Sequence, residues 1–241
     1  VFKESNVWVP ATSFGNYQCD SPELLINSSL NSAIKYAKEK NLDVEFTIFT
    51  GDMVAHDESK YITLETAKES EERIFRDMKT NLGDIPVYAV LGNHDTYPYG
   101  QIAPEKYGFS NRFTWNEDLM GNMWQSYDCI NETEADYARK HYTGYAVETK
   151  VGLKVISLNS NAWLTQNYYA FINATAPDNF GQFEFLIDEL VKSESINQRV
   201  WIIAHVPPAV GGLPIPSNVF AQIVERFSPS TIAGIFFGHT H

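Results

Sequence analysis

Residues 87–95 read Val-Tyr-Ala-Val-Leu-Gly-Asn-His-Asp, an apolar run that stops at Gly92 and is followed at once by three polar side chains. β-Branched and aromatic residues in a run of this length are typical of a buried strand. Three further apolar runs also lead into polar residues, and they cover residues 44–50, 199–204 and 232–237. We therefore predict a sheet whose chemistry lies in the loops at the carboxyl ends of its strands.

Segments with helical spacing lie between these runs. We expect one helix to begin at Asp20-Ser21-Pro22-Glu23, where a capping residue precedes a proline and an acid, and to end near Lys40. Strands alternating with helices predict an α/β fold in which helices cover buried sheet faces. Residues 1–20 are expected to be loop, whereas residues 97–150 are aromatic and rich in loop signals and, apart from one short helix, hard to assign. Further helices are expected over residues 63–80, 117–124, 180–192 and 218–227, and a further strand over residues 152–158.

The composition limits the partners that the chain can have. The 241 residues are 44% hydrophobic and 20% charged, which is ordinary for a folded globular protein. Lys and Arg total 18 against 30 Asp and Glu, a net charge of −12, and no basic block occurs. We therefore expect no nucleic-acid partner, because binding to a phosphate backbone requires clustered cations. No apolar run approaches the ~20 residues of a membrane span, and no signal-peptide pattern opens the chain.

Five of the six histidines lie in the four loops that follow the predicted strands. The sixth, His141, is expected to be a surface or packing residue. A single histidine at a strand end usually makes a structural hydrogen bond, so only the ordered set of loops favours a metal site. The loops are Thr50–His56, Gly92–Asp95, Ala204–Pro207 and Gly238–His241.

The residue types in these loops suit a divalent cation. Neutral imidazole and carboxylate are ligands for zinc, iron and manganese, and a neighbouring glycine lets the backbone come close to an ion. One carboxylate can bridge two cations. A pair of cations about 3.5–4 Å apart can clamp a phosphate and activate a bridging water. The pattern therefore predicts a metal site at these strand ends.

The four loops resemble the calcineurin-like metallophosphoesterase family, whose blocks read D-x-H, G-D-x-x, G-N-H-D/E, a single His and G-H-x-H. The last four blocks occur here in order, from residue 51 to residue 241. Phe14–Pro22, Gly51–Asp57, Gly92–Pro98 and Phe236–His241 are similar to the acid sphingomyelinase and sphingomyelinase-like phosphodiesterase branch. The resemblance implies a four-layer α-β-β-α sandwich, and a single catalytic domain over residues 1–241 that is truncated at both ends.

The resemblance also implies a metal ligand set. Asp52 would bridge two divalent ions, for which zinc is the expected metal. Asn93, His205 and His239 would complete one site, and His241 would belong to the other.

Three further residues would serve catalysis by the same resemblance. His94 would lie beside the substrate phosphate and protonate the leaving oxygen, oriented by a carboxylate such as Asp95. His56, four residues after Asp52, is a second candidate for this acid role.

The chain departs from the family pattern at one block. No Asp-x-His occurs anywhere in it, and it begins at Val1, where the family would already have passed its first strand. We expect the chain to be a fragment in which one metal site is complete. The second site would keep only Asp52 and His241, and would lack one Asp and one His.

The resemblance implies hydrolysis of a phosphodiester, sphingomyelin-like or a nucleotide diester, by attack of a metal-bound hydroxide. An endopolyphosphatase or phosphomonoesterase of the same fold is an alternative within the family. A non-catalytic fragment that cannot hold two metals is the alternative outside it. The purple acid phosphatase branch is disfavoured, because its tyrosine ligand would fall at Ala55.

The expected partner is a small-molecule or lipid phosphodiester, including lipid at a membrane surface, and no protein partner is evident. The resemblance places the protein in a secreted, extracellular, vacuolar or lysosomal setting, where it would be a glycoprotein. Three sequons begin at Asn27, Asn131 and Asn173, about as many as chance gives, so they add little. The two cysteines, Cys19 and Cys129, are too few for a disulfide scaffold, and whether they pair is open.

Overall fold

Two sheets form the centre of the computed structural model, which describes the chain except residues 1, 5, 6 and 10. Strands β3 and β4 pair in parallel, with Thr47 opposite Val87. Four strands form the larger sheet in the order β5-β6-β7-β8, which is parallel except for the antiparallel edge strand β5. The strands are β3 Thr47–Phe49, β4 Val87–Ala89, β5 Tyr145–Glu148, β6 Lys154–Ser157, β7 Val200–Ile203 and β8 Ile232–Phe236.

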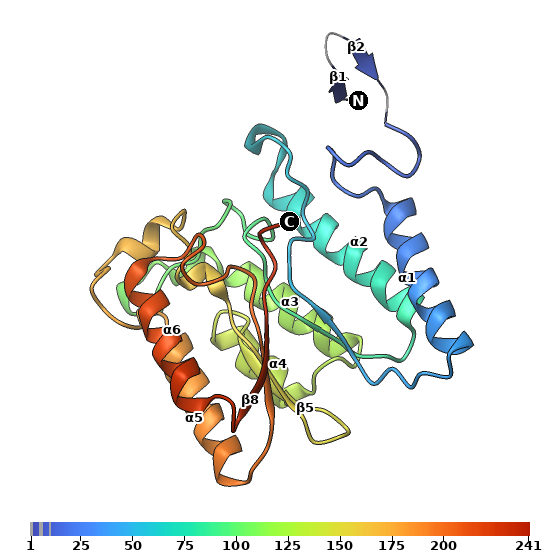
Figure 1. Cartoon of the computed structure of the whole chain (residues 1–241). Helices are drawn as coiled ribbons and strands as arrows, with labels where there is room; N and C mark the ends of the chain where they lie inside the picture. The colour runs from blue at the N-terminus through green and yellow to red at the C-terminus, as the bar shows by residue number, and fades with distance from the viewer. Residues whose placement is uncertain (1, 5–6, 10) are drawn as a thin grey trace.

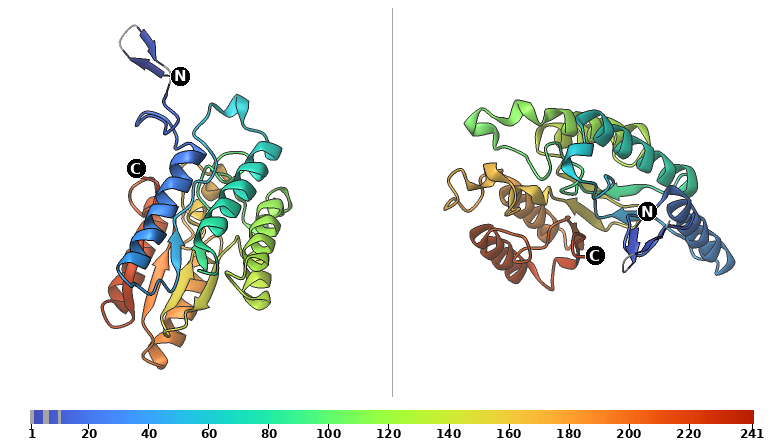
Figure 2. Two further views of the ribbon diagram at one scale, coloured as in Figure 1. Left: turned by 90° about the vertical axis from the view of Figure 1, so that its right-hand side faces the viewer. Right: turned by 90° about the horizontal axis from the view of Figure 1, so that it is seen from above.

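The helices lie in two groups with the strands between them, as Figures 1 and 2 show. Helices α1 to α4 flank the β3-β4 sheet, and helices α5 and α6 cover the outer face of the larger sheet. The helices are α1 Glu23–Glu39, α2 Leu64–Leu82, α3 Thr114–Ser126, α4 Glu132–Lys140, α5 Gln182–Ser195 and α6 Pro214–Phe227.

Side chains along the strands of the larger sheet point alternately to its two faces, and this divides the core into two clusters. Ile156, Val200 and Ile202 pack against α5 and α6, whereas Val155 and Ile203, one residue away, face the β3-β4 side. Successive strand residues point to opposite faces, so each strand contributes to both layers. The expected four-layer α-β-β-α sandwich is therefore confirmed. Tyr145 ties the two sheets together, because its hydroxyl donates a hydrogen bond to the Ala89 carbonyl over 2.9 Å.

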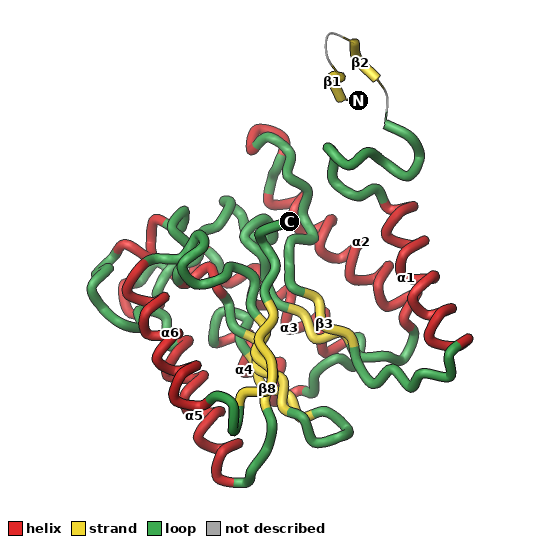
Figure 3. The backbone as a smooth tube through the Cα atoms, viewed as in Figure 1, coloured by secondary structure: helices red, strands yellow, loops and turns green. Residues whose placement is uncertain are grey.

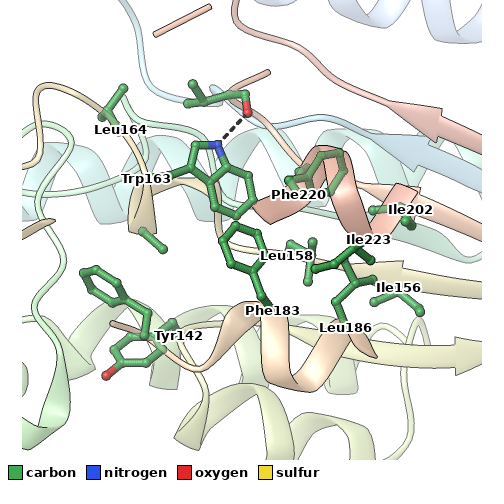
Figure 4. Close-up of a cluster of buried hydrophobic side chains, with 14 of the residues drawn as sticks. Tyr142, Ile156, Leu158, Trp163, Leu164, Phe183, Leu186, Ile202, Phe220 and Ile223 are labelled. Atoms are coloured by element: carbon green, nitrogen blue, oxygen red, sulfur yellow. Dashed lines mark hydrogen bonds between the residues drawn. The ribbon is translucent and has the colours of Figure 1, made fainter. Parts of the chain in front are cut away.

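The cluster under α5 and α6 also anchors a loop of the site. Trp163 stacks on Phe183 with ring centroids 5.4 Å apart (Figure 4). Its indole N–H donates a hydrogen bond to the Val206 carbonyl over 3.0 Å. Val206 directly follows His205. The bond therefore fixes the chain at the end of β7 against a fully buried side chain.

The local structure differs from the expectations at three places. Residues 2–4 and 7–9, expected to be loop, form the antiparallel pair of strands β1 Phe2–Glu4 and β2 Val7–Val9. The region 97–150 contains α3, which is longer than expected, and also α4 and β5. Helix α4 has few apolar residues to signal it, and it begins instead with a capping box between Asn131 and Glu134. Asp20 does not cap α1, whose N-cap position is Pro22.

Among the residues that the structure describes, no helix combines the length and the apolar character needed to cross a membrane. Cys19 is exposed and Cys129 is buried, and the two thiols are free rather than paired. His141 follows the last turn of α4 and lies against the Tyr137 ring, with centroids 3.9 Å apart. His141 is also exposed, which agrees with the expectation that it is a surface or packing residue.

Candidate metal centre

The loops that follow the strands converge at one end of the two sheets, where Figure 3 shows β8 running into the segment that ends at the C-terminus. An open cavity of about 1,100 Å³ lies there. Its walls come from the loops after β3, β7 and β8 and from the facing sides of α1 and α2. The predicted site residues Asp52, His56, His205, His239 and His241 line it.

Four ligand atoms from four loops meet at one point of this cavity. His205 Nε2 lies 2.8 Å from Asn93 Oδ1 and 3.1 Å from Asp52 Oδ2. His239 Nδ1 lies 2.8 Å from the same Asn93 oxygen. The ligand-competent atoms of Asp52, His205 and His239 all lie within 4.8 Å of one another. The structure thus brings together the four residues predicted to complete the first metal site.

The orientation of His205 is set by its other ring nitrogen. Nδ1 lies 2.6 Å from the Thr50 carbonyl oxygen, which can only accept, so Nδ1 carries the proton. When the ring is neutral, the lone pair is therefore on Nε2, the nitrogen that faces Asn93 and Asp52. Such a partner on the remote ring nitrogen is typical of histidines that bind metals. The backbone of His205 is held as well, because its N–H donates to Ser160 Oγ over 3.1 Å.

Glycine is required where two of the loops meet. A Cβ on Gly92 would lie 2.1 Å from Asp52 Oδ1 and 2.3 Å from the Asp52 nitrogen. Only a residue without a side chain lets the loops after β3 and β4 approach this closely. Three predicted ligands themselves have left-handed backbone, with φ of 64° at Asp52, 70° at His239 and 46° at His241. Such strain is concentrated at functional sites in proteins.

The electrostatics of the first site follow from burial and from close pairs. Burial raises the pKa of Asp52, but the hydrogen bond and charge of His205, together with His94, outweigh it and leave this pKa below its usual range. Burial acts to lower the pKa of His205, but the Asp52 carboxylate outweighs it and raises this pKa. Burial and the neighbouring His205 lower the pKa of His239. Asp52 is therefore an anion that attracts positive charge at this point.

A second group of histidines lies on the other side of Asp52. Ligand-competent atoms of Asp52, His56 and His94 also lie within 4.8 Å of one another. The rings of His56 and His94 have centroids 3.9 Å apart, and His241 lies edge-on to His56 at 4.8 Å. The backbone N–H of His94 donates to Asp52 Oδ1 over 2.9 Å. Burial lowers the pKa of His94, which favours its neutral form.

Asp95 does not orient the His94 ring, so that part of the expectation was wrong. Its carboxylate is buried and accepts four backbone N–H groups, those of Asp52, Met53, Val54 and Gly92, over 2.5–3.1 Å. Because every one of these donors belongs to the two loops that meet at Asp52, Asp95 fixes the loops to each other. Burial raises the pKa of Asp95 to about 6.

A carboxylate that the sequence analysis did not assign to the site holds His56. Asp20 Oδ1 lies 2.7 Å from His56 Nδ1, and Asp20 Oδ2 accepts the His56 backbone N–H over 2.8 Å. Because Asp20 occupies the Nδ1 side of the ring, Nε2 is the nitrogen on the side that faces the site. In the sequence Asp20 resembles a helix cap, and no local pattern reveals a partner 36 residues away.

The donor set of the first site fits a divalent cation. It offers two imidazole nitrogens, one carboxylate oxygen and one amide oxygen, a mixture that zinc, iron and manganese accept. The other side of Asp52 offers only histidines from the described residues, namely His56, His94 and His241.

The chain is similar to known proteins over most of its length. Residues 27–241 match the family described as Calcineurin-like phosphoesterase. The chain is 34% identical to Sphingomyelin phosphodiesterase 2 of Caenorhabditis elegans, over 99% of this chain and 38% of that protein. It is 31% identical to human Cyclic GMP-AMP phosphodiesterase SMPDL3A, over 95% of this chain and 49% of that protein. The chain therefore spans less than half the length of these two curated relatives.

A solved structure shows the same fold. The crystal structure of a dimetal phosphatase from Danio rerio superimposes with a TM-score of 0.52 at 12% identity, over 89% of this chain and 72% of that one. At this identity the likeness concerns the fold alone.

Proposed function

From the premise that the chain belongs to the calcineurin-like phosphoesterase family, we propose that it takes part in metal-dependent hydrolysis of phosphodiesters. The observation that carries the proposal is the convergence of Asp52, Asn93, His205 and His239 on one point at the cavity wall. These four residues would hold one divalent ion. We propose zinc as the resident metal, because two imidazoles and a carboxylate are a common zinc ligand set.

Cations bound at Asp52 would supply Lewis-acid charge and an activated water. They would also offset the acidity of the chain where an anionic diester must bind, since the net charge of the whole protein is −12. The remaining functions fall to side chains of this chain. His94 and His56 lie together beside Asp52, and His56 lines the cavity.

We assign the proton for the leaving oxygen to this histidine pair. Asp20 holds one His56 proton on Nδ1 and fixes the ring toward His94, so the transferred proton would be a second one, carried on Nε2. The His94 ring is fixed in turn. The Tyr99 ring lies edge-on to it with centroids 4.7 Å apart, and the His94 backbone N–H donates a hydrogen bond to Asp52 Oδ1. A ring held between two neighbours loses little freedom when a substrate arrives, which favours proton transfer at a defined atom.

The substrate class that we propose is a small-molecule or lipid phosphodiester. Support comes from the curated relatives, which are named as sphingomyelin and cyclic GMP-AMP phosphodiesterases. A secreted or vacuolar/lysosomal location is proposed on the resemblance alone. Immunolocalisation in the source cells tests it, and a cytosolic signal would contradict it.

The proposal is tested with three generic substrates and the purified chain loaded with Zn²⁺ or Mn²⁺. Bis-p-nitrophenyl phosphate represents diesters, p-nitrophenyl phosphate represents monoesters, and long-chain polyphosphate represents the endopolyphosphatase alternative. We expect the diester to be hydrolysed fastest and the activity to disappear with EDTA and in Asp52→Asn. Preference for a monoester or polyphosphate would overturn the diester assignment. Bound metal without turnover of any substrate would show a non-catalytic chain.

A further inference from the structure

The side-chain amide of Asn93 can face the metal position in two ways. Its oxygen and nitrogen ends have nearly the same shape, but only the oxygen can donate a lone pair to a cation, because the NH₂ group is a donor of hydrogen bonds. Asn93 is buried, with 1% of its surface exposed. Whatever holds the outer end of this amide therefore decides whether the inner end can bind a metal.

The outer end is held by Tyr99. Asn93 Nδ2 donates a hydrogen bond to the Tyr99 hydroxyl oxygen over 2.7 Å. The Tyr99 hydroxyl donates in turn to Gln166 Oε1 over 3.2 Å. Because the hydroxyl proton is directed at Gln166, the phenol presents a lone pair to Asn93, and only the NH₂ end of the amide satisfies it. Asn93 Oδ1 then faces His205 and His239.

The backbone keeps Tyr99 and Asn93 in register. The Asn93 carbonyl accepts hydrogen bonds from the Gly100 N–H and from Thr96 Oγ1, both at 2.9 Å. Gln101 Nε2 donates to the carbonyl of Tyr99 over 2.9 Å and to that of Gln166 over 2.8 Å. The loop after β4 is thereby closed on itself and tied to the segment that carries Gln166.

We propose that Tyr99 is a positioning residue for the metal centre, which fixes the Asn93 amide with its oxygen toward the cation. The inference rests on the proposed function, because it requires that Asn93 binds a metal. Tyr99 itself stays outside the ligand set, since its hydroxyl lies on the far side of the amide. Tyr99 contributes to the difference in free energy between two orientations of the Asn93 amide, one with Oδ1 toward the cation and the other with Nδ2 toward it.

The test measures the affinity of the purified chain for Zn²⁺ by calorimetry with a competing chelator. Tyr99→Phe removes one oxygen from a side chain that is 37% exposed. Loss of a hydrogen-bond partner of a metal ligand typically weakens metal binding 10–100-fold, and we expect about 10-fold here. Tyr97→Phe is the matched control, because Tyr97 is a neighbouring tyrosine of 36% exposure, and its Zn²⁺ affinity should stay within twofold of the parent.

A double-mutant cycle separates orientation from a merely structural effect. In an Asn93→Asp background both ends of the side chain are oxygens, so orientation no longer matters. Tyr99→Phe should then change the Zn²⁺ affinity less than twofold. An equal loss in both backgrounds would overturn the proposal, as would parental affinity in Tyr99→Phe alone.

Two further measurements keep the outcomes distinct. If Tyr99→Phe does not fold, as judged by circular dichroism, Gln166→Leu replaces it, because Gln166 is exposed and only directs the hydroxyl proton. We expect an affinity about threefold lower, and an unchanged affinity would refute the inference. A parent chain that binds no Zn²⁺ would refute the proposed function instead.

Discussion

Replacing Gly92 with alanine should destroy the metal centre while leaving the two sheets in place. The added Cβ would lie 2.1 Å from Asp52 Oδ1, 2.3 Å from its backbone nitrogen and 2.9 Å from its Cγ. Ordinary van der Waals contact begins near 3.4 Å, so the Asp52 loop must retreat by roughly 1.3 Å, the difference between 3.4 and 2.1 Å. The nearest atoms are backbone and a carboxylate that His94 also binds, so no flexible group can absorb this shift.

Two quantities follow from that displacement. Overpacking of a well-packed region lowers the free energy of unfolding by about 1–3 kcal/mol, and thermal unfolding of the metal-free variant would detect this loss. Metal sites tolerate about 0.2 Å in ligand distance, so we expect Zn²⁺ affinity to fall at least ~100-fold by calorimetry. Gly83→Ala is the control, because its Cβ meets nothing within 4 Å although its φ of 63° makes alanine strained. It should lose about 1 kcal/mol and keep its Zn²⁺ affinity. A Gly92→Ala chain with affinity within threefold of the parent would refute the reasoning.

Three further substitutions test other parts of the account. Asp52→Asn keeps the shape of the side chain but removes its charge, so bound metal measured by mass spectrometry and diester hydrolysis should both be lost; full activity would refute its role as the shared ligand. His94→Ala should lower turnover about 10²–10⁴-fold with metal content intact, and loss of metal would make His94 a ligand instead. Burial, aided by the charges of Asp118 and Glu105, raises the pKa of Glu117 to about 8. The folded chain therefore keeps this proton to higher pH than the unfolded chain does. As a result the folded state loses stability as the pH rises from the ordinary glutamate range toward 8. Glu117→Gln should therefore raise Tm by about 3–6 °C at pH 8 and change it little at pH 4.5, as measured by calorimetry. Equal shifts at both pH values would contradict this origin.

The sequence predicted most of the buried strands and their polar ends, because apolar runs that stop at glycine are local signals. It also predicted that the polar strand ends would converge, since the carboxyl ends of parallel strands share one edge, and the family resemblance singled out Asp52, Asn93, His205 and His239 among them. Helix α4 and strand β5 were missed because α4 is short and polar and β5 is a four-residue edge strand. Their positions depend on tertiary packing rather than on local pattern.

The partners of the site residues could not be read from the sequence for the same reason. Asp20 was interpreted as a helix cap, yet its carboxylate binds His56. Asp95 was expected from the family resemblance to orient the His94 ring, yet its oxygens accept backbone N–H groups from the facing loop. Tyr99 gave no signal at all, since its contact with Asn93 depends on how the loop after β4 closes.

The central claim is that one cation is held jointly by Asp52 Oδ2, Asn93 Oδ1, His205 Nε2 and His239 Nδ1. Anomalous diffraction from a crystal grown with Zn²⁺, recorded on both sides of the zinc absorption edge, tests it directly. We predict a peak within about 2.0–2.3 Å of all four atoms. A zinc peak elsewhere on the chain, with these four side chains turned away from one another, would contradict the account.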